Sequence, residues 1–290
     1  MSDLNSELNR DIPRDIPLKK MYKYTSFDRA LDILMRNRIY FAKLSEFNDP
    51  FERLVTLDSD TPEGRRTLIE NMVKKARERW PNMSMAAMTE EQKQEFVNNP
   101  SAADRLNRAV INELLKDSTG FCCLTNTCQS LPMWAHYANS HTGCCLMFDF
   151  SKYPDQKMEE NDFPFHYMTK IKYGEKLPKY NMGRLWIGYS YKSIEWQYEN
   201  EWRAVMYDKD IASGSFSNPV LIKKSNGANF YPLGKFLREV ILGYKMNDTH
   251  KMCIMLAAKQ RNISVRQASP ELYKYGIRLT EVDGKQLNQV

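Results

Sequence analysis

The sequence predicts an α+β protein built around a mixed β-sheet, because strands outnumber helices over most of the chain. From Gly120 onward, compact apolar runs such as "FCCLT" and "GCCLMFDF" predict buried strands. Few strand–helix–strand alternations occur there, which argues against a doubly wound parallel sheet. The stretch 62–118 is instead rich in Arg, Lys, Glu and Met at helical spacing. It predicts a helical insertion within a single α+β domain that spans 21–290.

The first elements follow from capping and periodicity. Residues 1–20 are polar and predict a flexible N-terminal lead. The run "MYKYTS" predicts a strand, and its Ser26 suits the N-cap of a helix whose apolar residues share one face. Asn37 can end that helix, and "IYFAK" at 39–43 predicts the next strand.

Later elements alternate between strands and two short helices. The segment "LPMWAHYANSH" predicts a helix, with Pro132 in its first turn. The segment "NDTHKMCIMLAAKQ" predicts a second helix near the C-terminus. Strands are predicted for "FHYMTKIKY", "EWRAVMYD", "PVLIKK", "REVILGY" and "NISVRQ".

Composition narrows the class of protein. The 290 residues carry a net charge of +6, which permits a nucleic-acid partner without requiring one. No apolar run approaches the roughly 18 residues that a membrane span needs, and the N-terminus lacks the apolar core of a signal peptide. We therefore expect a cytoplasmic protein with no membrane partner. The six cysteines include two adjacent pairs and no C-x-x-C spacing, so we expect no metal site.

The segment "LSEFNDPFE" contains a strong turn signal. Asn48 and Asp49 bond readily to their own backbone, and Pro50 restricts the residue before it. We expect a tight turn here with Phe47 and Phe51 buried on either side. The alternative is that Asn48, Asp49 and Glu52 bind a hard cation such as Mg²⁺ through their oxygen atoms.

The most unusual segment is "WQYENEWR" at 196–203, which places two carboxylates among three aromatic rings. In a strand, Glu199, Glu201 and Arg203 would point to one face. Two carboxylates on one face repel each other unless a cation lies near them. Arg203 could supply that charge in a structural ion pair, or the pair of glutamates could form a binding and catalytic site.

Five motifs in order support a resemblance to a known family. They are "YKYTS", "FNDPFE", "CLTNT…LPMWAHYANSHTGCCLMFDF", "WQYENEWR" and "REVILGY". Together the segments, over roughly 21–270, resemble a bacterial family of domains of unknown function, number twenty-nine seventy-one. The chain is also similar, more weakly, to the ADP-ribosyltransferase fold, a split mixed β-sheet that binds NAD in a central cleft.

The second resemblance implies roles for particular residues. It implies that NAD is a substrate and that Glu201 is the catalytic glutamate, with Glu199 as its partner. The resemblance also implies a cofactor-binding set, in which Lys23 stands where the fold often has histidine. That set consists of Tyr22, Lys23, Tyr24, Trp134, Tyr137 and Arg203.

The leading hypothesis is therefore an NAD-dependent ADP-ribosyltransferase-like enzyme that modifies nucleic acid or protein. By family analogy it would act as a toxin or a phage-defence effector, together with a neutralising partner protein. One alternative is a metal-dependent nuclease that uses Asp49, Glu52 and the two glutamates at 199 and 201. Another is a non-enzymatic binding or sensor module.

Overall fold

The computed structural model describes most of the chain. The described residues are 19–52, 56–57, 61–79, 81–82, 84–102, 105, 119–151, 167–180, 189–207, 230–233 and 236–282. Three predicted segments fall wholly or mainly outside them. These are the N-terminal lead, the end of the helical insertion after 105, and the strand "PVLIKK".

The chain divides into two compact units. The sheet unit comprises 14–43, 119–171 and 195–290, and the helical unit comprises 1–13, 44–118 and 172–194. The sequence predicted one domain with a helical insertion at 62–118. The structure groups those helices with 172–194, a segment that comes more than fifty residues later in the chain.

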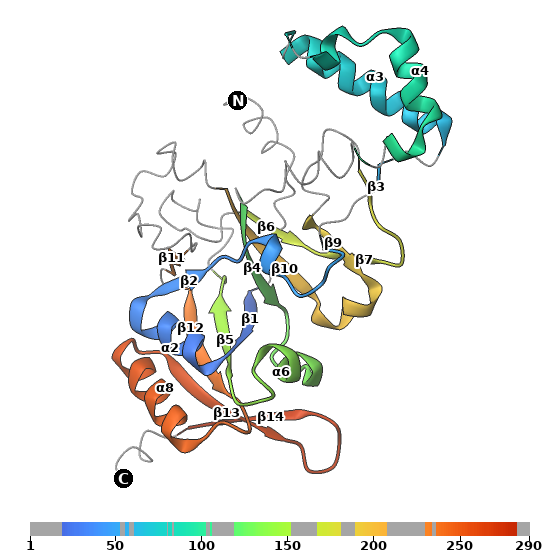
Figure 1. The fold of residues 1–290 in the computed structure, drawn as a ribbon. Coiled ribbons are helices and arrows are strands. Elements are labelled where there is room, and N and C mark those ends of the chain that lie inside the picture. Colours follow the sequence, from blue (N-terminus) through green and yellow to red (C-terminus); the bar gives the residue numbers. More distant parts are fainter. Residues whose placement is uncertain are drawn as a thin grey trace. The chain divides into compact units, whose positions relative to one another are not determined.

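Within the described residues, the sheet unit contains one eight-stranded mixed sheet in the order β14-β13-β12-β5-β1-β4-β10-β6 (Figure 1). Strands β12 and β13 are parallel, and the other neighbours are antiparallel. The α+β class and the mixed sheet are therefore confirmed. The strands are β1 Lys20–Thr25, β4 Thr119–Thr125, β5 Cys144–Asp149, β6 Tyr167–Lys170, β10 Glu201–Tyr207, β12 Leu237–Leu242, β13 Ser264–Pro270 and β14 Ile277–Glu281.

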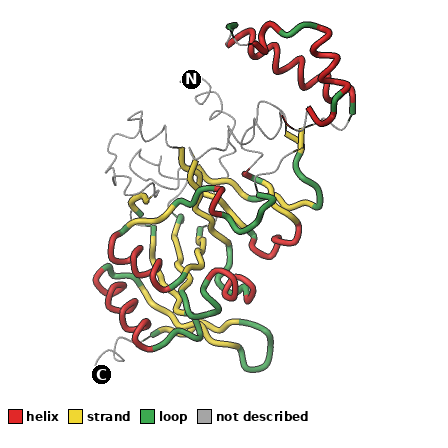
Figure 2. Tube along the Cα trace, viewed as in Figure 1, coloured by secondary structure: helices red, strands yellow, loops and turns green. Residues whose placement is uncertain are grey.

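Helices cover the sheet on two faces (Figure 2). Helices α2 (Phe27–Arg36) and α8 (Asp248–Gln260) pack on one face, where Met21, Leu124 and Leu146 belong to the main apolar core. A second apolar cluster lies on the opposite face under α6 (Leu131–Tyr137). Successive residues of a strand point to opposite faces, so each strand contributes alternately to the two clusters.

The predicted helix boundaries are confirmed where caps were identified. The Ser26 side chain accepts a hydrogen bond from the Arg29 amide, and Asn37 adopts a left-handed conformation with φ 50° at the end of α2. Pro132 lies in the first turn of α6, where its missing N–H has no intrahelical partner to lose. Asn247 caps α8 through its side chain.

Where the structure describes it, the helical unit contains two α-helices and two small sheets. Helix α3 (Pro62–Arg79) packs against α4 (Glu90–Asn98), and the buried Arg65 side chain donates a 2.6 Å hydrogen bond to the Val97 carbonyl. The parallel strand pairs are β3 (Thr56–Leu57) with β8 (Lys179–Tyr180), and β7 (Lys172–Gly174) with β9 (Tyr191–Ser193).

The remaining elements are short. In the sheet unit, β2 (Arg38–Tyr40) pairs with β11 (Phe230–Pro232). The 3-10 helices of the described residues are η1 Leu44–Glu46, η2 Ser84–Ala87 and η4 Ile194–Glu199. Among the described residues, no helix has both the length and the apolar character to cross a membrane.

Candidate functional site

One row of directly paired residues crosses five strands of the sheet. It consists of Glu201 on β10, Thr125 on β4, Tyr22 on β1, Met147 on β5 and Glu239 on β12. Directly paired residues point to the same face of a sheet. Tyr22 packs against the apolar cluster under α6, so the row lies on the α6 face. Adjacent strands are separated by about 4.8 Å, which makes the row roughly 19 Å long.

At one end of the row, Glu201 forms a buried ion pair with Arg203. The Arg203 Nε atom lies 2.7 Å from Glu201 Oε1, and Nη2 lies 3.2 Å from Oε2. The Arg203 side chain is fully buried, and that of Glu201 is 5% exposed. The strand period explains this pairing, because residues two apart on β10 share a face. The arrangement fixes the orientation of the Glu201 carboxylate through two hydrogen bonds.

Glu199 is also buried, but it lies outside β10, so strand alternation does not set the direction of its side chain. It ends the 3-10 helix η4, and Asn200 follows with φ 44°, in the left-handed region that asparagine tolerates. The Tyr137 hydroxyl donates a 2.5 Å hydrogen bond to Glu199 Oε1. The Thr125 hydroxyl donates a 2.6 Å bond to the Glu199 carbonyl. Thr125 therefore contacts Glu199 through its side chain and pairs with Glu201 through its backbone.

Two of the predicted ring contacts lie in the core. Trp134 is fully buried, and its indole N–H donates a 2.8 Å hydrogen bond to the Cys128 carbonyl. Tyr24 is 6% exposed and packs edge-on against Trp134 at 5.2 Å between ring centroids. The Tyr24 hydroxyl donates to the Thr127 carbonyl. These contacts anchor α6 to the sheet and thereby position Tyr137, the last residue of the helix.

Tyr22 is the partly exposed aromatic residue of the row. Burial, followed by the neighbouring Cys128 thiol, raises the pKa of the Tyr22 hydroxyl to about 12. Burial also raises the pKa of Cys128, and its hydrogen bond with Tyr22 opposes that shift. Tyr22 therefore remains a neutral phenol at physiological pH and can donate or accept a hydrogen bond on the α6 face.

Lys23 does not share this face, so the expectation that it lines a common cleft with Glu201 is wrong. Strand alternation turns Lys23 away from Tyr22 and Tyr24. Its ammonium donates a 3.1 Å hydrogen bond to the Cys123 carbonyl, and it interacts with the Cys122 thiol in the main core. The structure thus brings Tyr22, Tyr137, Glu199, Glu201 and Arg203 together on the α6 face of the sheet.

Sequence reasoning missed one contributor to this region, Thr125. Thr125 connects the two glutamates, and its position at the end of the predicted strand "FCCLT" was the available signal. The half-buried Tyr198 packs near His136 of α6, with 6.3 Å between ring centroids. Tyr198 also lies 6.1 Å from the Trp196 ring, so aromatic side chains surround the segment that carries Glu199.

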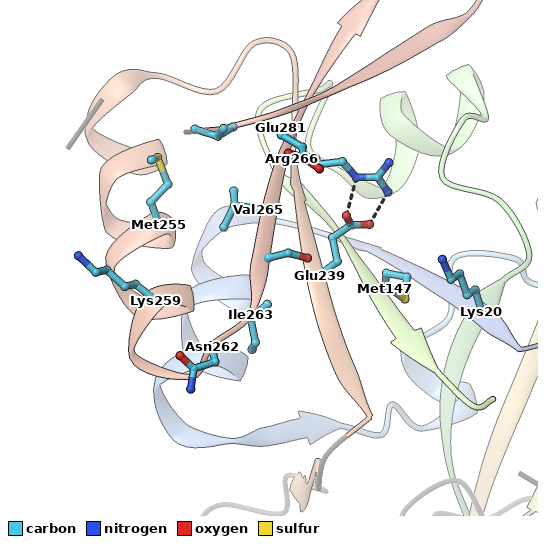
Figure 3. A pocket seen from close by; sticks show the side chains of 12 residues that line it. Lys20, Met147, Glu239, Met255, Lys259, Asn262, Ile263, Val265, Arg266 and Glu281 are labelled. Atoms are coloured by element: carbon cyan, nitrogen blue, oxygen red, sulfur yellow. Dashed lines mark hydrogen bonds and ion pairs between the residues drawn. The ribbon is translucent and has the colours of Figure 1, made fainter. Parts of the chain in front are cut away.

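At the other end of the row, a cavity of about 700 Å³ opens beside Glu239 (Figure 3). Both Glu239 carboxylate oxygens accept hydrogen bonds from the Arg266 guanidinium. Lys20 and Met147 line the cavity beside Glu239, whereas Lys259 lines it from α8, on the other face of the sheet (Figure 3). The cavity is large enough for a small-molecule ligand. Neither Glu199 nor Glu201 lines it.

The "FNDPFE" turn lies in the helical unit. Asp49 Oδ1 accepts a 2.8 Å hydrogen bond from the Phe51 amide, as the turn chemistry predicted. The Phe51 side chain is 57% exposed, so the prediction that it is buried is wrong; the Asp49 side chain holds the turn without it. Glu52 is buried in a 3.0 Å ion pair with Lys192. Among the described residues, no group of three His, Cys, Asp or Glu side chains could hold a metal ion.

Comparison with known proteins connects the site to one family. A family model described as a protein of unknown function (DUF2971) matches residues 133–204. The resemblance inferred from the motifs is therefore confirmed over this segment, which includes most of α6, all of β5, Glu199 and Glu201. No curated protein and no solved structure shows significant similarity to the chain.

Proposed function

We propose that the protein is an NAD-dependent ADP-ribosyltransferase-like enzyme that acts on a nucleic-acid or protein acceptor. The observation that carries the proposal is a pair of buried, oriented carboxylates: Glu199 accepts a hydrogen bond from Tyr137 of α6, and Glu201, held by Arg203, lies in one row with Tyr22. Under this proposal, the mixed sheet is an ADP-ribosyltransferase-like core. A role as a toxin or phage-defence effector rests on family analogy alone.

The proposed chemistry needs a fixed negative charge near a ribose. When the bond between nicotinamide and ribose breaks, the bonding electron pair leaves with neutral nicotinamide, and positive charge develops at the sugar. A carboxylate stabilises such an oxocarbenium-like centre in glycoside hydrolysis. Arg203 holds Glu201 in one orientation, so that little reorganisation is needed as the charge develops. Glu199 would accept the proton that the attacking acceptor loses when its bond to the sugar forms.

With the nicotinamide half of NAD at Glu201, the adenosine half would extend toward the cavity beside Glu239. The row from Glu201 to Glu239 spans four strand spacings, roughly 19 Å, which suits an extended dinucleotide. Lys20 and Arg266 would supply positive charge for the pyrophosphate. Because Glu201 is buried, the proposal requires the chain that covers it to open when the ligand enters.

Release of nicotinamide from NAD by the purified full chain tests the proposal. The change Glu201→Gln preserves the shape of the side chain and removes its charge. It should lower turnover at least a hundredfold, on the order of 3 kcal/mol of transition-state stabilisation. Glu199→Gln should also lower turnover. The matched control is Glu195→Gln, an exposed glutamate of η4, which should retain wild-type activity.

Two outcomes would overturn the proposal. One is a wild-type protein that neither consumes NAD nor binds it in calorimetry. The other is a folded Glu201→Gln protein with unchanged turnover. If NAD is consumed, transfer of a label from its adenosine half to added nucleic acid or protein distinguishes the two classes of acceptor.

A further inference from the structure

The loop between β13 and β14 exposes an unusual set of large side chains. Leu272 is 76% exposed, Tyr273 is 98% exposed and Tyr275 is 100% exposed. The loop has a defined base, because Pro270 pairs with Ile277 and the Glu271 amide donates a 3.0 Å hydrogen bond to the Gly276 carbonyl. Figure 1 shows the loop extending beyond the two strands that it joins. Full exposure of two tyrosines on an ordered hairpin indicates a surface that contacts another molecule.

A second loop places similar residues at the same end of the sheet. Tyr244 is 50% exposed and the adjacent Lys245 is also exposed; both follow the C-terminal end of β12. Strands β12 and β13 are parallel neighbours, so the loops that follow them lie at the same end of the sheet. The Gln267 side chain, in the middle of β13, donates hydrogen bonds to the Leu242 and Gly243 carbonyls at the end of β12.

Exposed cations outnumber carboxylates at this end. Lys245, Lys274 and Arg278 are exposed, and the carboxylates are the partly exposed Glu271 in the hairpin loop and the exposed Asp248 at the start of α8. The Lys274 ammonium lies 3.8 Å from Glu271 Oε1, and the Lys274 side chain is 74% exposed, so this surface pair leaves the ammonium accessible. The cations alternate with the rings, as Tyr244-Lys245 in one loop and Tyr273-Lys274-Tyr275 in the other.

We propose that this end of the sheet binds single-stranded nucleic acid, with bases stacked on Tyr273 and Tyr275. Lys245, Lys274 and Arg278 would contact the phosphates. Aromatic faces interleaved with cations are the combination that binds single strands without strict sequence preference. A protein interface of this size is expected to have a contiguous apolar centre. Here Lys274 lies between Tyr273 and Tyr275, Lys245 follows Tyr244, and Leu272 is the aliphatic residue of the hairpin loop. The inference uses no residue of the proposed NAD site and does not depend on its chemistry.

Fluorescence anisotropy with the full chain tests this proposal. The probes are fluorescein-labelled oligo(dT) and oligo(U) of about 20 nucleotides, long enough for one stacking site. The double change Tyr273→Ser and Tyr275→Ser should weaken binding at least about twentyfold, because each lost base stack weakens binding roughly fivefold or more. Lys274→Glu should weaken binding and reduce its dependence on salt concentration. Comparison of the two probes shows whether DNA or RNA is preferred.

The control variant is Leu256→Ser, which removes a half-exposed apolar side chain from α8 and should bind like the wild type. All these side chains are exposed, so the melting temperatures should remain close to that of the wild type. Failure of the wild type to bind either probe at low salt would overturn the proposal. So would equal affinity of the double variant and the control. Loss of self-association by the double variant in light scattering, without an effect on oligonucleotide binding, would also overturn it and assign the hairpin to a protein contact.

Discussion

Removing Arg203 should destabilise the sheet unit strongly, because Glu201 would keep its charge in a buried position. At 2.7 Å and an effective dielectric constant of about 20, the attraction between the two side chains is roughly 6 kcal/mol, and desolvation offsets part of it. Loss of one partner of a buried pair typically costs about 3–5 kcal/mol. We therefore expect the change Arg203→Met to lower the free energy of unfolding by that amount. At an m value of about 3 kcal/mol/M, the urea midpoint should fall by roughly 1–2 M.

The double variant Glu201→Leu with Arg203→Met separates the ion pair from simple packing. Replacing both partners of a buried pair by apolar residues is often neutral or stabilising, so the double variant should recover most of the lost stability. Urea unfolding followed by tryptophan fluorescence measures both proteins, since the buried Trp134 and Trp202 report on this unit. The reasoning is refuted if Arg203→Met costs less than about 1 kcal/mol, or if the double variant is less stable than the single one.

Two further changes test the packing around the turn after α6. A Cβ atom at Gly143 would lie 2.2 Å from the Thr25 carbonyl oxygen, so Gly143→Ala should cost about 1–3 kcal/mol in chemical denaturation. Gly174→Ala, with its nearest atom at 3.7 Å, is the control; equal losses would contradict the packing argument. Burial, and then the charge of Lys245, lowers the pKa of His141 in the folded protein. The unfolded state therefore binds the proton more readily. The free energy of unfolding should fall as the pH drops below the ordinary histidine pKa of about 6.5. Asparagine tolerates the φ of 71° at position 141, so His141→Asn should fold and should lose less stability at low pH than the wild type. Unfolding free energies measured over a pH series test this. An unchanged pH dependence in the variant would contradict the role of His141.

Local sequence signals were sufficient where a single period or cap decides the structure. The Ser26 and Asn37 caps predicted the ends of α2, and alternation on β10 predicted that Glu201 and Arg203 share a face. The same alternation places Lys23 opposite Tyr22, so that error was avoidable from the sequence. Capping depends on residues within one helical turn, and alternation depends on consecutive residues of one strand. Both sets of residues are adjacent in the sequence.

Other features depend on contacts that no local pattern encodes. The left-handed Asn200 separates Glu199 from β10, so the alternation argument, which treated Glu199 as a strand residue, does not apply to it. Strand β14 was not predicted, since four of its five residues are at least partly exposed and give little apolar signal. The row that joins Glu201 to Glu239 required the order of the sheet, which brings strands together from distant parts of the chain.

The position of β1 between β4 and β5 has a consequence for how the chain folds. Lys23 of β1 bonds to Cys123 of β4 across 100 residues of sequence, and β12 to β14 complete the sheet from beyond residue 236. Contacts between such distant residues slow folding, because the intervening chain must be confined before any pairing is gained. During synthesis, both edges of β1 therefore remain without their sheet partners until β4 and β5 have left the ribosome. A chain cut before β12 would retain β5 as an unpaired edge, a template for aggregation instead of a folded fragment.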